Sequence, residues 1–87
     1  MPLDIELELF GALRGLEAGD RLTLAVDGEH VADLRGALQA HAGAHWPNAS
    51  TAMLASCAFA TSNEILRDAQ ALPADGGMAV LPPVSGG

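Results

Sequence analysis

Two short segments near the start of this 87-residue chain alternate apolar and polar residues, and this pattern constrains the fold most. In the run 4–10, Ile5, Leu7 and Leu9 alternate with acidic residues, and the run 21–26 (RLTLAV) alternates in the same way. Side chains of a β-strand point alternately to its two faces, so each segment predicts a strand with one buried and one exposed face. The short link between them predicts a hairpin with a longer loop than a tight turn.

The period of the apolar residues changes after Asp27 and Gly28. Four apolar residues then recur at helical spacing: Val31, Leu34, Leu38 and Ala42. This spacing predicts a helix with one buried face. Asp33 lies near its start, where a negative charge is favourable, and Gly43 is predicted to end it.

The second half of the chain predicts shorter elements. We expect a helical turn within 49–54, a strand at 55–61, and a very short strand at 64–66. The run 78–81 (MAVL) is apolar throughout, so it predicts a strand in the middle of the sheet rather than at an edge. The predicted fold class is therefore α+β, as one domain over residues 1–81 followed by a flexible tail at 82–87.

The charge of the chain excludes several kinds of partner. Eleven acidic residues stand against four arginines and no lysine, which gives a net charge of −7. Without a basic patch, we expect no nucleic-acid binding and no membrane binding. A basic protein partner fits this charge, although solubility alone explains it equally well. We found no secretory signal and no apolar run of membrane-spanning length, so we expect a cytoplasmic protein.

Few residues suggest a catalytic or metal site within the chain itself. His41 and His45 are four residues apart, but with Gly43 ending the helix between them a solvated pair is favoured over a metal site. Cys57, the single cysteine, lies in a predicted apolar strand, where we expect no nearby cationic partner, and is predicted to be a buried, unreactive thiol. Trp46 either anchors a partner or is partly buried beside Pro47.

The final residues 82–87 (PPVSGG) have the composition of an extended arm. Two prolines cannot donate hydrogen bonds to a sheet, and two glycines have no side chains and fit a narrow channel. From Leu81 onward such an arm reaches about 20 Å and presents the α-carboxylate of Gly87. The alternative is a frayed terminus or a cloning remnant.

With these features the sequence resembles the small, sulfur-carrier subunit of molybdopterin synthase, in the MoaD/ThiS-type ubiquitin-like family. The ending 81–87 (LPPVSGG) is close to the Pro-Pro-Val-x-Gly-Gly ending of these subunits. Three further segments match: Phe10 followed by Gly11, the helix start 31–35 (VADLR), and residues 72–76 before the last strand. The resemblance implies a β-grasp fold, a mixed sheet with one main helix on one face and the first and last strands side by side at its centre.

The resemblance also implies a function, a sulfur carrier in molybdenum cofactor biosynthesis. An E1-like adenylyltransferase would use MgATP to adenylate the Gly87 carboxylate, and a persulfide sulfur donor would convert it to a thiocarboxylate. The large synthase subunit, expected to form a heterotetramer with the carrier, would then receive the sulfur for cyclic pyranopterin monophosphate. The carrier would bind no cofactor or metal and would not be catalytic on its own.

The resemblance assigns a part to each residue of the arm. Gly87 carries the reacting carbon, and Gly86 lets the chain thread close to the partner. Ser85 and Val84 contribute contacts within the channel, while Pro83 and Pro82 limit the entropy lost on docking. Phe10 and Leu81 are either part of an apolar docking patch or part of the core.

Two other functions are compatible with the same residues. One is a sulfur carrier for another pathway, such as thiazole, cysteine or tungsten-cofactor synthesis. The other is a ubiquitin-like modifier that forms isopeptide bonds with proteins. The absence of lysine fits any role in which Gly87 is activated, because no side-chain amine of the chain can attack it. A plain interaction module would tolerate the removal of Gly86 and Gly87.

Overall fold

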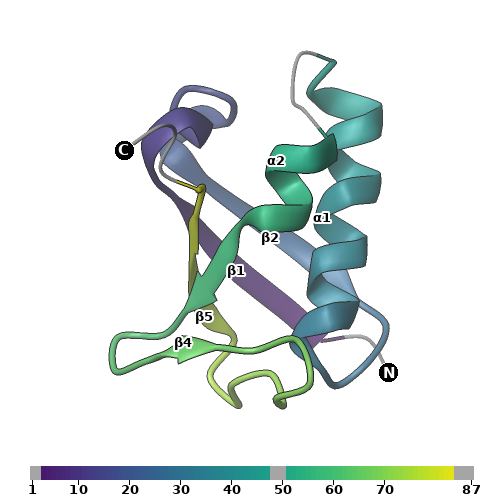
Figure 1. The fold of residues 1–87 in the computed structure, drawn as a ribbon, viewed down its shortest axis with the longest axis vertical. Helices are drawn as coiled ribbons and strands as arrows, with labels where there is room; N and C mark the ends of the chain where they lie inside the picture. The colour runs from purple at the N-terminus through teal and green to yellow at the C-terminus, as the bar shows by residue number, and fades with distance from the viewer. Residues whose placement is uncertain (1–2, 48–50, 84–87) are drawn as a thin grey trace.

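A computed structural model of the chain describes residues 3–47 and 51–83. It contains one five-stranded sheet in the order β2-β1-β5-β3-β4 (Figure 1). The strands are β1 (Leu3–Leu9), β2 (Arg21–Val26), β3 (Ala58–Ala60), β4 (Ile65–Leu66) and β5 (Gly77–Leu81). β1 and β5 are parallel, and the other neighbouring strands are antiparallel. The mixed sheet and the main helix packed on it confirm the predicted α+β fold class.

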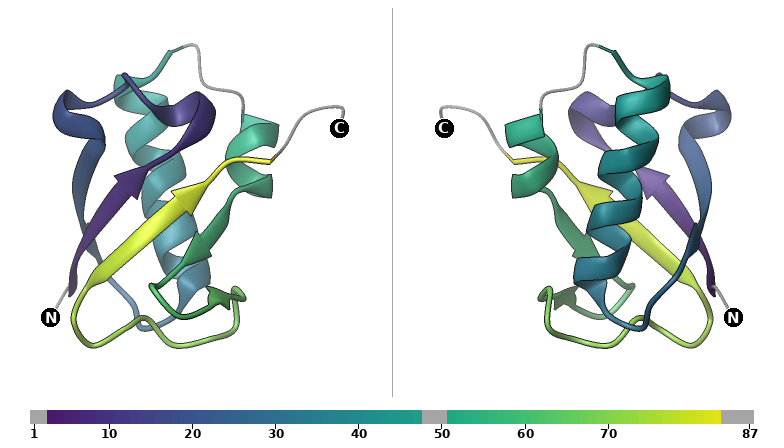
Figure 2. Two further views of the ribbon diagram at one scale, coloured as in Figure 1. Left: turned by 90° about the vertical axis from the view of Figure 1, so that its left-hand side faces the viewer. Right: turned by 90° about the vertical axis from the view of Figure 1, so that its right-hand side faces the viewer.

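The alternating segments form the strands that the sequence predicts. In β1, Ile5, Leu7 and Leu9 are buried, and the residues between them are exposed. The register places Ile5 opposite Leu24 and Leu7 opposite Leu22, so the buried faces of both strands coincide. Helix α1 (Val31–His45) covers this apolar face, and no helix of the described chain covers the other face (Figure 2).

The predicted end of α1 at Gly43 is wrong. The helix continues through Gly43 to His45, and the Trp46 N–H donates a hydrogen bond to the Ala42 carbonyl at 2.8 Å. A glycine inside a helix costs only about 1 kcal/mol relative to alanine. Burial of the large Trp46 side chain, which is 3% exposed, outweighs that cost and holds the last turn in place.

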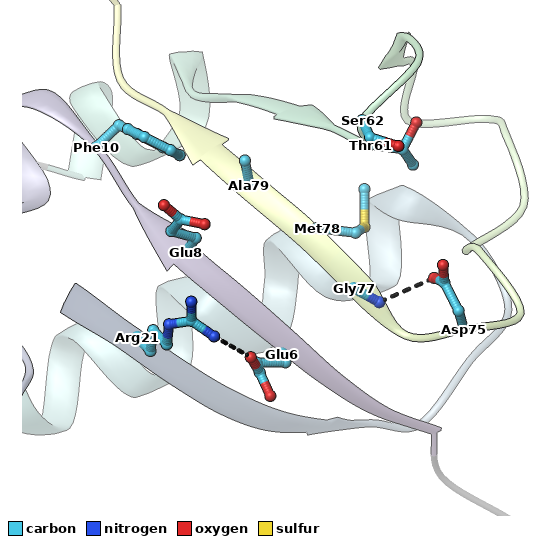
Figure 3. Close-up of a pocket in the computed structure, with 10 residues that line it drawn as sticks. All are labelled: Glu6, Glu8, Phe10, Arg21, Thr61, Ser62, Asp75, Gly77, Met78 and Ala79. Carbon is cyan, nitrogen blue, oxygen red and sulfur yellow. Dashed lines mark hydrogen bonds and ion pairs between the residues drawn. The ribbon is translucent and has the colours of Figure 1, made fainter. Parts of the chain in front are cut away.

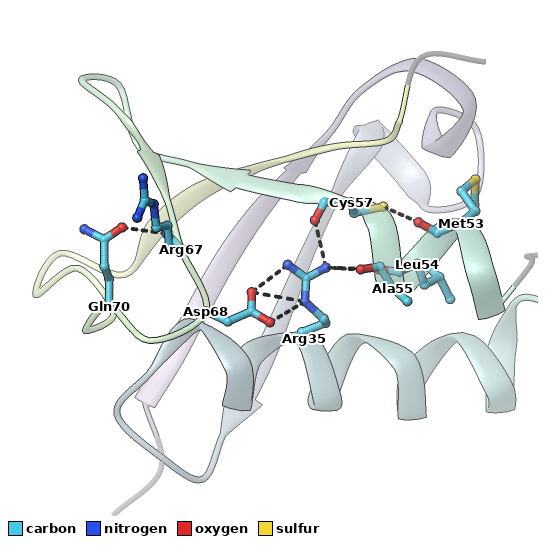
Figure 4. Close-up of polar contacts among 8 residues, drawn as sticks. All are labelled: Arg35, Met53, Leu54, Ala55, Cys57, Arg67, Asp68 and Gln70. Atoms are coloured by element: carbon cyan, nitrogen blue, oxygen red, sulfur yellow. Dashed lines mark hydrogen bonds and ion pairs between the residues drawn. The ribbon is translucent and has the colours of Figure 1, made fainter. Parts of the chain in front are cut away.

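The segment predicted as a strand from 55 to 61 is partly helical. Helix α2 (Thr51–Ser56) takes its first two residues, and β3 keeps only Ala58–Ala60. The Arg35 guanidinium explains where α2 ends. It donates hydrogen bonds to the carbonyls of Leu54, Ala55 and Cys57 at 3.2, 3.1 and 2.7 Å (Figure 4). Carbonyls at the end of a helix have no partner within it, so this single side chain stabilises the end of α2.

Strand β5 occupies the centre of the sheet, as its apolar sequence predicts. It lies between β1 and β3, with Val80 fully buried and Met78 6% exposed. Leu81, the last residue of the strand, pairs with Ala58. The proposed boundary between a domain ending at 81 and a tail beginning at 82 stays a prediction. In the described residues, no helix combines the length and the apolar character that crossing a membrane requires.

Candidate functional site

The end of β5 is the part of the structure from which the C-terminal arm leaves. Leu81 and Pro82 are partly exposed there, and Pro83 is exposed. Phe10, 36% exposed, has an extended backbone and follows β1 directly. The parallel register pairs Leu9 with Val80, and its continuation sets Phe10 beside Leu81. Figure 3 shows the Phe10 side chain next to β5.

The structure therefore brings together two of the predicted docking residues, Phe10 and Leu81, although they are distant in sequence. Their partial exposure means that they contribute to the surface as well as packing against their neighbours. The remaining predicted residues of the arm, Val84, Ser85, Gly86 and Gly87, lie outside the described residues. Their predicted roles are not tested by the structure.

The open face of the sheet carries a shallow pocket of about 370 Å³, with Phe10 at one end. Glu6 and Glu8 project into it from β1, and Asp75 from the turn before β5 (Figure 3). Arg21 is the only cationic residue among the described residues that line it. The pocket is therefore predominantly acidic, which fits the expectation of a basic partner surface.

One ion pair crosses this acidic face. Arg21 Nη1 lies 2.9 Å from Glu6 Oε1, across the antiparallel pair β1–β2. Both side chains are more than half exposed, so water screens the interaction and its contribution to stability is about 0–1 kcal/mol. Such a weak pair can be exchanged for contacts with a partner at little cost.

Cys57 is buried, as predicted, with 2% of its surface exposed. Burial raises the pKa of its thiol, and the nearby Arg35 guanidinium opposes this effect only in part. The expectation that no cation lies near Cys57 is therefore wrong, because Arg35 approaches from α1, which is distant in sequence. A thiol with a raised pKa is a poor nucleophile, so Cys57 is a structural residue.

His41 and His45 lie on one continuous helix, contrary to the prediction that the helix ends between them. Their ring centroids are 4.5 Å apart. His41 is not a solvated residue, because its Nε2 lies 2.9 Å from Glu17 Oε2 and its side chain is only 18% exposed. Across residues 3–47 and 51–83, no group of three or more His, Cys, Asp or Glu residues is arranged to hold a metal.

Glu17 has a structural role that the sequence did not predict. Its Oε2 also accepts a hydrogen bond from Trp46 Nε1 at 2.8 Å. The hydrogen bonds from His41 and Trp46 hold the pKa of the Glu17 carboxyl below its usual range. A buried indole needs a hydrogen-bond acceptor, so Trp46 was the residue in the sequence that indicated such a contact. The acceptor itself could not be predicted, because Glu17 lies in a loop 29 residues away.

Comparison with known proteins places these features in a family. The sequence matches the model of the ThiS family over residues 7–87. The crystal structure of SAMP1 from Haloferax volcanii is similar to this chain, with a TM-score of 0.67 and 27% sequence identity. That match covers 97% of this chain and 99% of SAMP1. No curated protein matches the sequence.

These matches confirm the MoaD/ThiS-type resemblance and the ubiquitin-like β-grasp fold. Two features of the structure agree with the family match over residues 7–87. The first and last strands are a parallel pair, and the main helix crosses one face of the sheet. The chain belongs to the ThiS family of ubiquitin-like proteins.

Proposed function

We propose that this protein is a sulfur carrier of molybdenum cofactor biosynthesis whose Gly87 carboxylate is converted to a thiocarboxylate. The observation that carries the sulfur-carrier part of this proposal is the family match, which extends over residues 7–87 and so includes the Pro-Pro-Val-Ser-Gly-Gly segment. That segment is the part of the chain closest to the small subunits of molybdopterin synthase.

The chemistry requires three steps, none of which this chain catalyses itself. A carboxylate is a poor electrophile, so an E1-like adenylyltransferase first uses MgATP to form an acyl-adenylate at Gly87 and releases pyrophosphate. The terminal sulfur of a persulfide donor then attacks the acyl carbon, and AMP leaves. Cleavage of the sulfur–sulfur bond by a thiol reductant leaves the thiocarboxylate on Gly87.

Three features of the protein support a role as the presented substrate. The single thiol, Cys57, is buried with a raised pKa, so it is a poor nucleophile. No lysine is present to capture an activated Gly87 within the chain. The open face of the sheet next to the end of β5 is acidic, which suits a basic partner such as the activating enzyme or the large synthase subunit.

Mass spectrometry tests the sulfur-carrier chemistry directly. The protein is incubated with an E1-like adenylyltransferase, MgATP and a persulfide donor, and then analysed intact and by fragmentation. We expect the replacement of one oxygen by one sulfur, localised to Gly87. Localisation is essential because oxidation of Cys57 or a methionine gives almost the same mass change. An unmodified Gly87 with a partner that loads another carrier would refute the proposal.

The pathway needs a separate experiment. The thiocarboxylated protein is mixed with the large subunit of molybdopterin synthase and cyclic pyranopterin monophosphate. Formation of molybdopterin, with return of Gly87 to the carboxylate, supports the molybdenum pathway. Sulfur loading without this transfer would indicate a carrier for thiazole, cysteine or tungsten-cofactor synthesis instead.

A second candidate function is that of a ubiquitin-like protein modifier. The observation that favours it is the similarity to SAMP1, a ubiquitin-like small archaeal modifier, over nearly the full length of both chains. Activated Gly87 would then form an isopeptide bond with a lysine of a target protein. Ladders of conjugates on an immunoblot that disappear when Gly87 is deleted would support this function.

A further inference from the structure

We infer that Gly11 is a positioning residue for the C-terminal arm, because it forms a seat against which the ring of Pro82 packs. The inference deepens the proposed function, since a carrier must present Gly87 to its partners in a defined direction. It rests on the contact between two described residues and not on any placement of residues 84–87.

The register of the sheet brings these two residues together. β1 and β5 are parallel, with Glu6 opposite Gly77 and Leu9 opposite Val80. The same one-to-one register, continued past the ends of the strands, sets Gly11 opposite Pro82. In Figures 1 and 2, the turn that begins at Gly11 and the end of β5 lie at the same end of the sheet.

The contact leaves no space for a side chain at position 11. A Cβ atom added to Gly11 would lie 2.8 Å from Pro82 Cγ and 3.5 Å from Pro82 Cδ. Real Cβ contacts are essentially never shorter than 3.0 Å, so one partner would have to move. Gly11 also has φ +59°, a left-handed conformation that glycine adopts without strain.

Neither partner can move easily. The Pro82 ring is closed onto its own backbone nitrogen, so beyond a change of ring pucker its Cγ cannot move without displacing the main chain where it leaves the sheet. Gly11 begins the short 3-10 helix η1 (Gly11–Leu13), whose last residue, Leu13, is fully buried. The Leu13 N–H donates a hydrogen bond to the Phe10 carbonyl at 3.1 Å, which fixes the turn to β1.

A fixed base of the arm assists docking. Restricting the direction of Pro82 before binding reduces the conformational entropy that is lost when a partner takes up the arm. Displacing Pro82 should therefore weaken the encounter with the activating enzyme more than the chemical step. We expect this as a rise in KM, with kcat changed much less.

Gly11→Ala tests the inference, and the same loop offers a matched control. Gly19 also has a positive φ, +70°, but an added Cβ there meets nothing within 4 Å. Both substitutions carry the strain of alanine in a left-handed conformation, and only Gly11→Ala pushes against Pro82. We expect Gly11→Ala to raise KM for adenylation about 5- to 10-fold, and Gly19→Ala to change it less than about 2-fold.

A double-mutant cycle with Pro82→Ala distinguishes the loss of the Gly11–Pro82 contact from a general loss of folding as the cause of the Gly11→Ala effect. Pro82→Ala removes Cγ and Cδ from the ring, so a Cβ at position 11 no longer meets them. Gly11→Ala should therefore have little further effect in the Pro82→Ala background. An equal effect of Gly11→Ala in both backgrounds, or equal effects of Gly11→Ala and Gly19→Ala, would overturn the inference.

An NMR measurement on the free protein tests the seat independently of the proposed function. Gly11→Ala should shift the amide resonances of Leu81 and Val84, whereas Gly19→Ala should leave them unchanged. If these shifts occur but wild-type protein is never adenylated, the seat stands and the proposed function fails. If adenylation proceeds normally and neither variant moves Leu81 or Val84, the seat is refuted and the function stands.

Discussion

The indole Nε1 of Trp46 donates a hydrogen bond of 2.8 Å to the carboxylate of Glu17. This contact joins the end of α1 to the loop between β1 and β2, and it explains why the helix extends past Gly43. His41 binds the same carboxylate oxygen at 2.9 Å, and the His41 and Trp46 rings meet edge to face. The three side chains hold the loop that also contains the Gly11 seat.

Trp46→Phe should lower the free energy of unfolding by about 1–3 kcal/mol, because Glu17 loses a donor and the core loses part of the indole volume. Urea denaturation followed by far-ultraviolet circular dichroism measures this, since the substitution removes the only tryptophan. In a Glu17→Ala background the cost of Trp46→Phe should fall by about 1 kcal/mol. An unchanged cost would mean that packing alone stabilises this region.

The stability of the protein should fall in acid through Glu17 and Asp68. Hydrogen bonds from His41 and Trp46 lower the pKa of Glu17, and hydrogen bonds from Arg35 lower that of Asp68. A carboxyl whose pKa is lower in the folded state stabilises it fully above the unfolded value, which is about 4.5 for Glu and 3.8 for Asp. This stabilisation is lost as the pH falls through the lowered, folded pKa.

Urea midpoints measured between about pH 6 and about pH 3 test this expectation. Glu17→Gln, which keeps an acceptor for Trp46 but does not titrate, should show a shallower decline than wild type. Adding Asp68→Asn should make the decline shallower still. Identical slopes for the wild type and both variants would exclude these two carboxyls as a source of the acid sensitivity.

Arg35→Lys should destabilise the protein by about 2–3 kcal/mol although it conserves the charge. The Arg35 guanidinium binds Asp68 through two nitrogens, at 2.7 and 3.1 Å, while it also bonds to the carbonyls at the end of α2. A lysine ammonium cannot make this set of bonds from one position. Arg67→Lys, at an exposed position, is the control and should change stability by less than about 0.5 kcal/mol. Equal, small effects of Arg35→Lys and Arg67→Lys would show that the hydrogen bonds of the Arg35 guanidinium are dispensable for stability.

Gly43→Ala should stabilise the protein by about 0.5–1 kcal/mol. Gly43 is exposed within α1, and an added Cβ meets nothing within 4 Å. Alanine reduces the entropy of the unfolded chain and favours the helix. Gly76→Ala is the contrasting variant, since its Cβ would lie 2.7 Å from the Asp4 carbonyl oxygen at φ +72°, so it should destabilise. Thermal unfolding of both variants shows whether the signs are opposite.

Deleting Gly87, or adding one residue after it, should abolish thiocarboxylate formation while leaving the free energy of unfolding unchanged within about 0.5 kcal/mol. One residue moves the reacting carbon by about 3.5 Å, which is too far for a positioned acyl transfer. Mass spectrometry after incubation with the activating enzyme, together with thermal unfolding, measures both effects. Sulfur loading of either variant would contradict the assignment of Gly87 as the reacting residue.

Much of the fold of this protein can be predicted from local sequence patterns. The alternation in β1 and β2 identifies both strands and their buried faces, because the two-residue period depends only on backbone geometry. The four apolar positions of α1 identify its buried face for the same kind of reason. The continuous apolar run of β5 predicts its central place, and the ending 81–87 carries the family resemblance.

Contacts between segments distant in sequence could not be predicted from local patterns. Arg35 decides where α2 ends, Glu17 stabilises the last turn of α1, and Pro82 meets Gly11 across the β1–β5 pair. Each contact joins residues that lie far apart in the sequence, so the pattern around either residue does not predict it. Local patterns alone predicted β1, β2 and β5 and the buried faces of β1 and β2, but they placed the start of β3 three residues too early. The ends of the helices and the loop that supports the arm depend on hydrogen bonds and packing between residues distant in sequence, which no local pattern encodes.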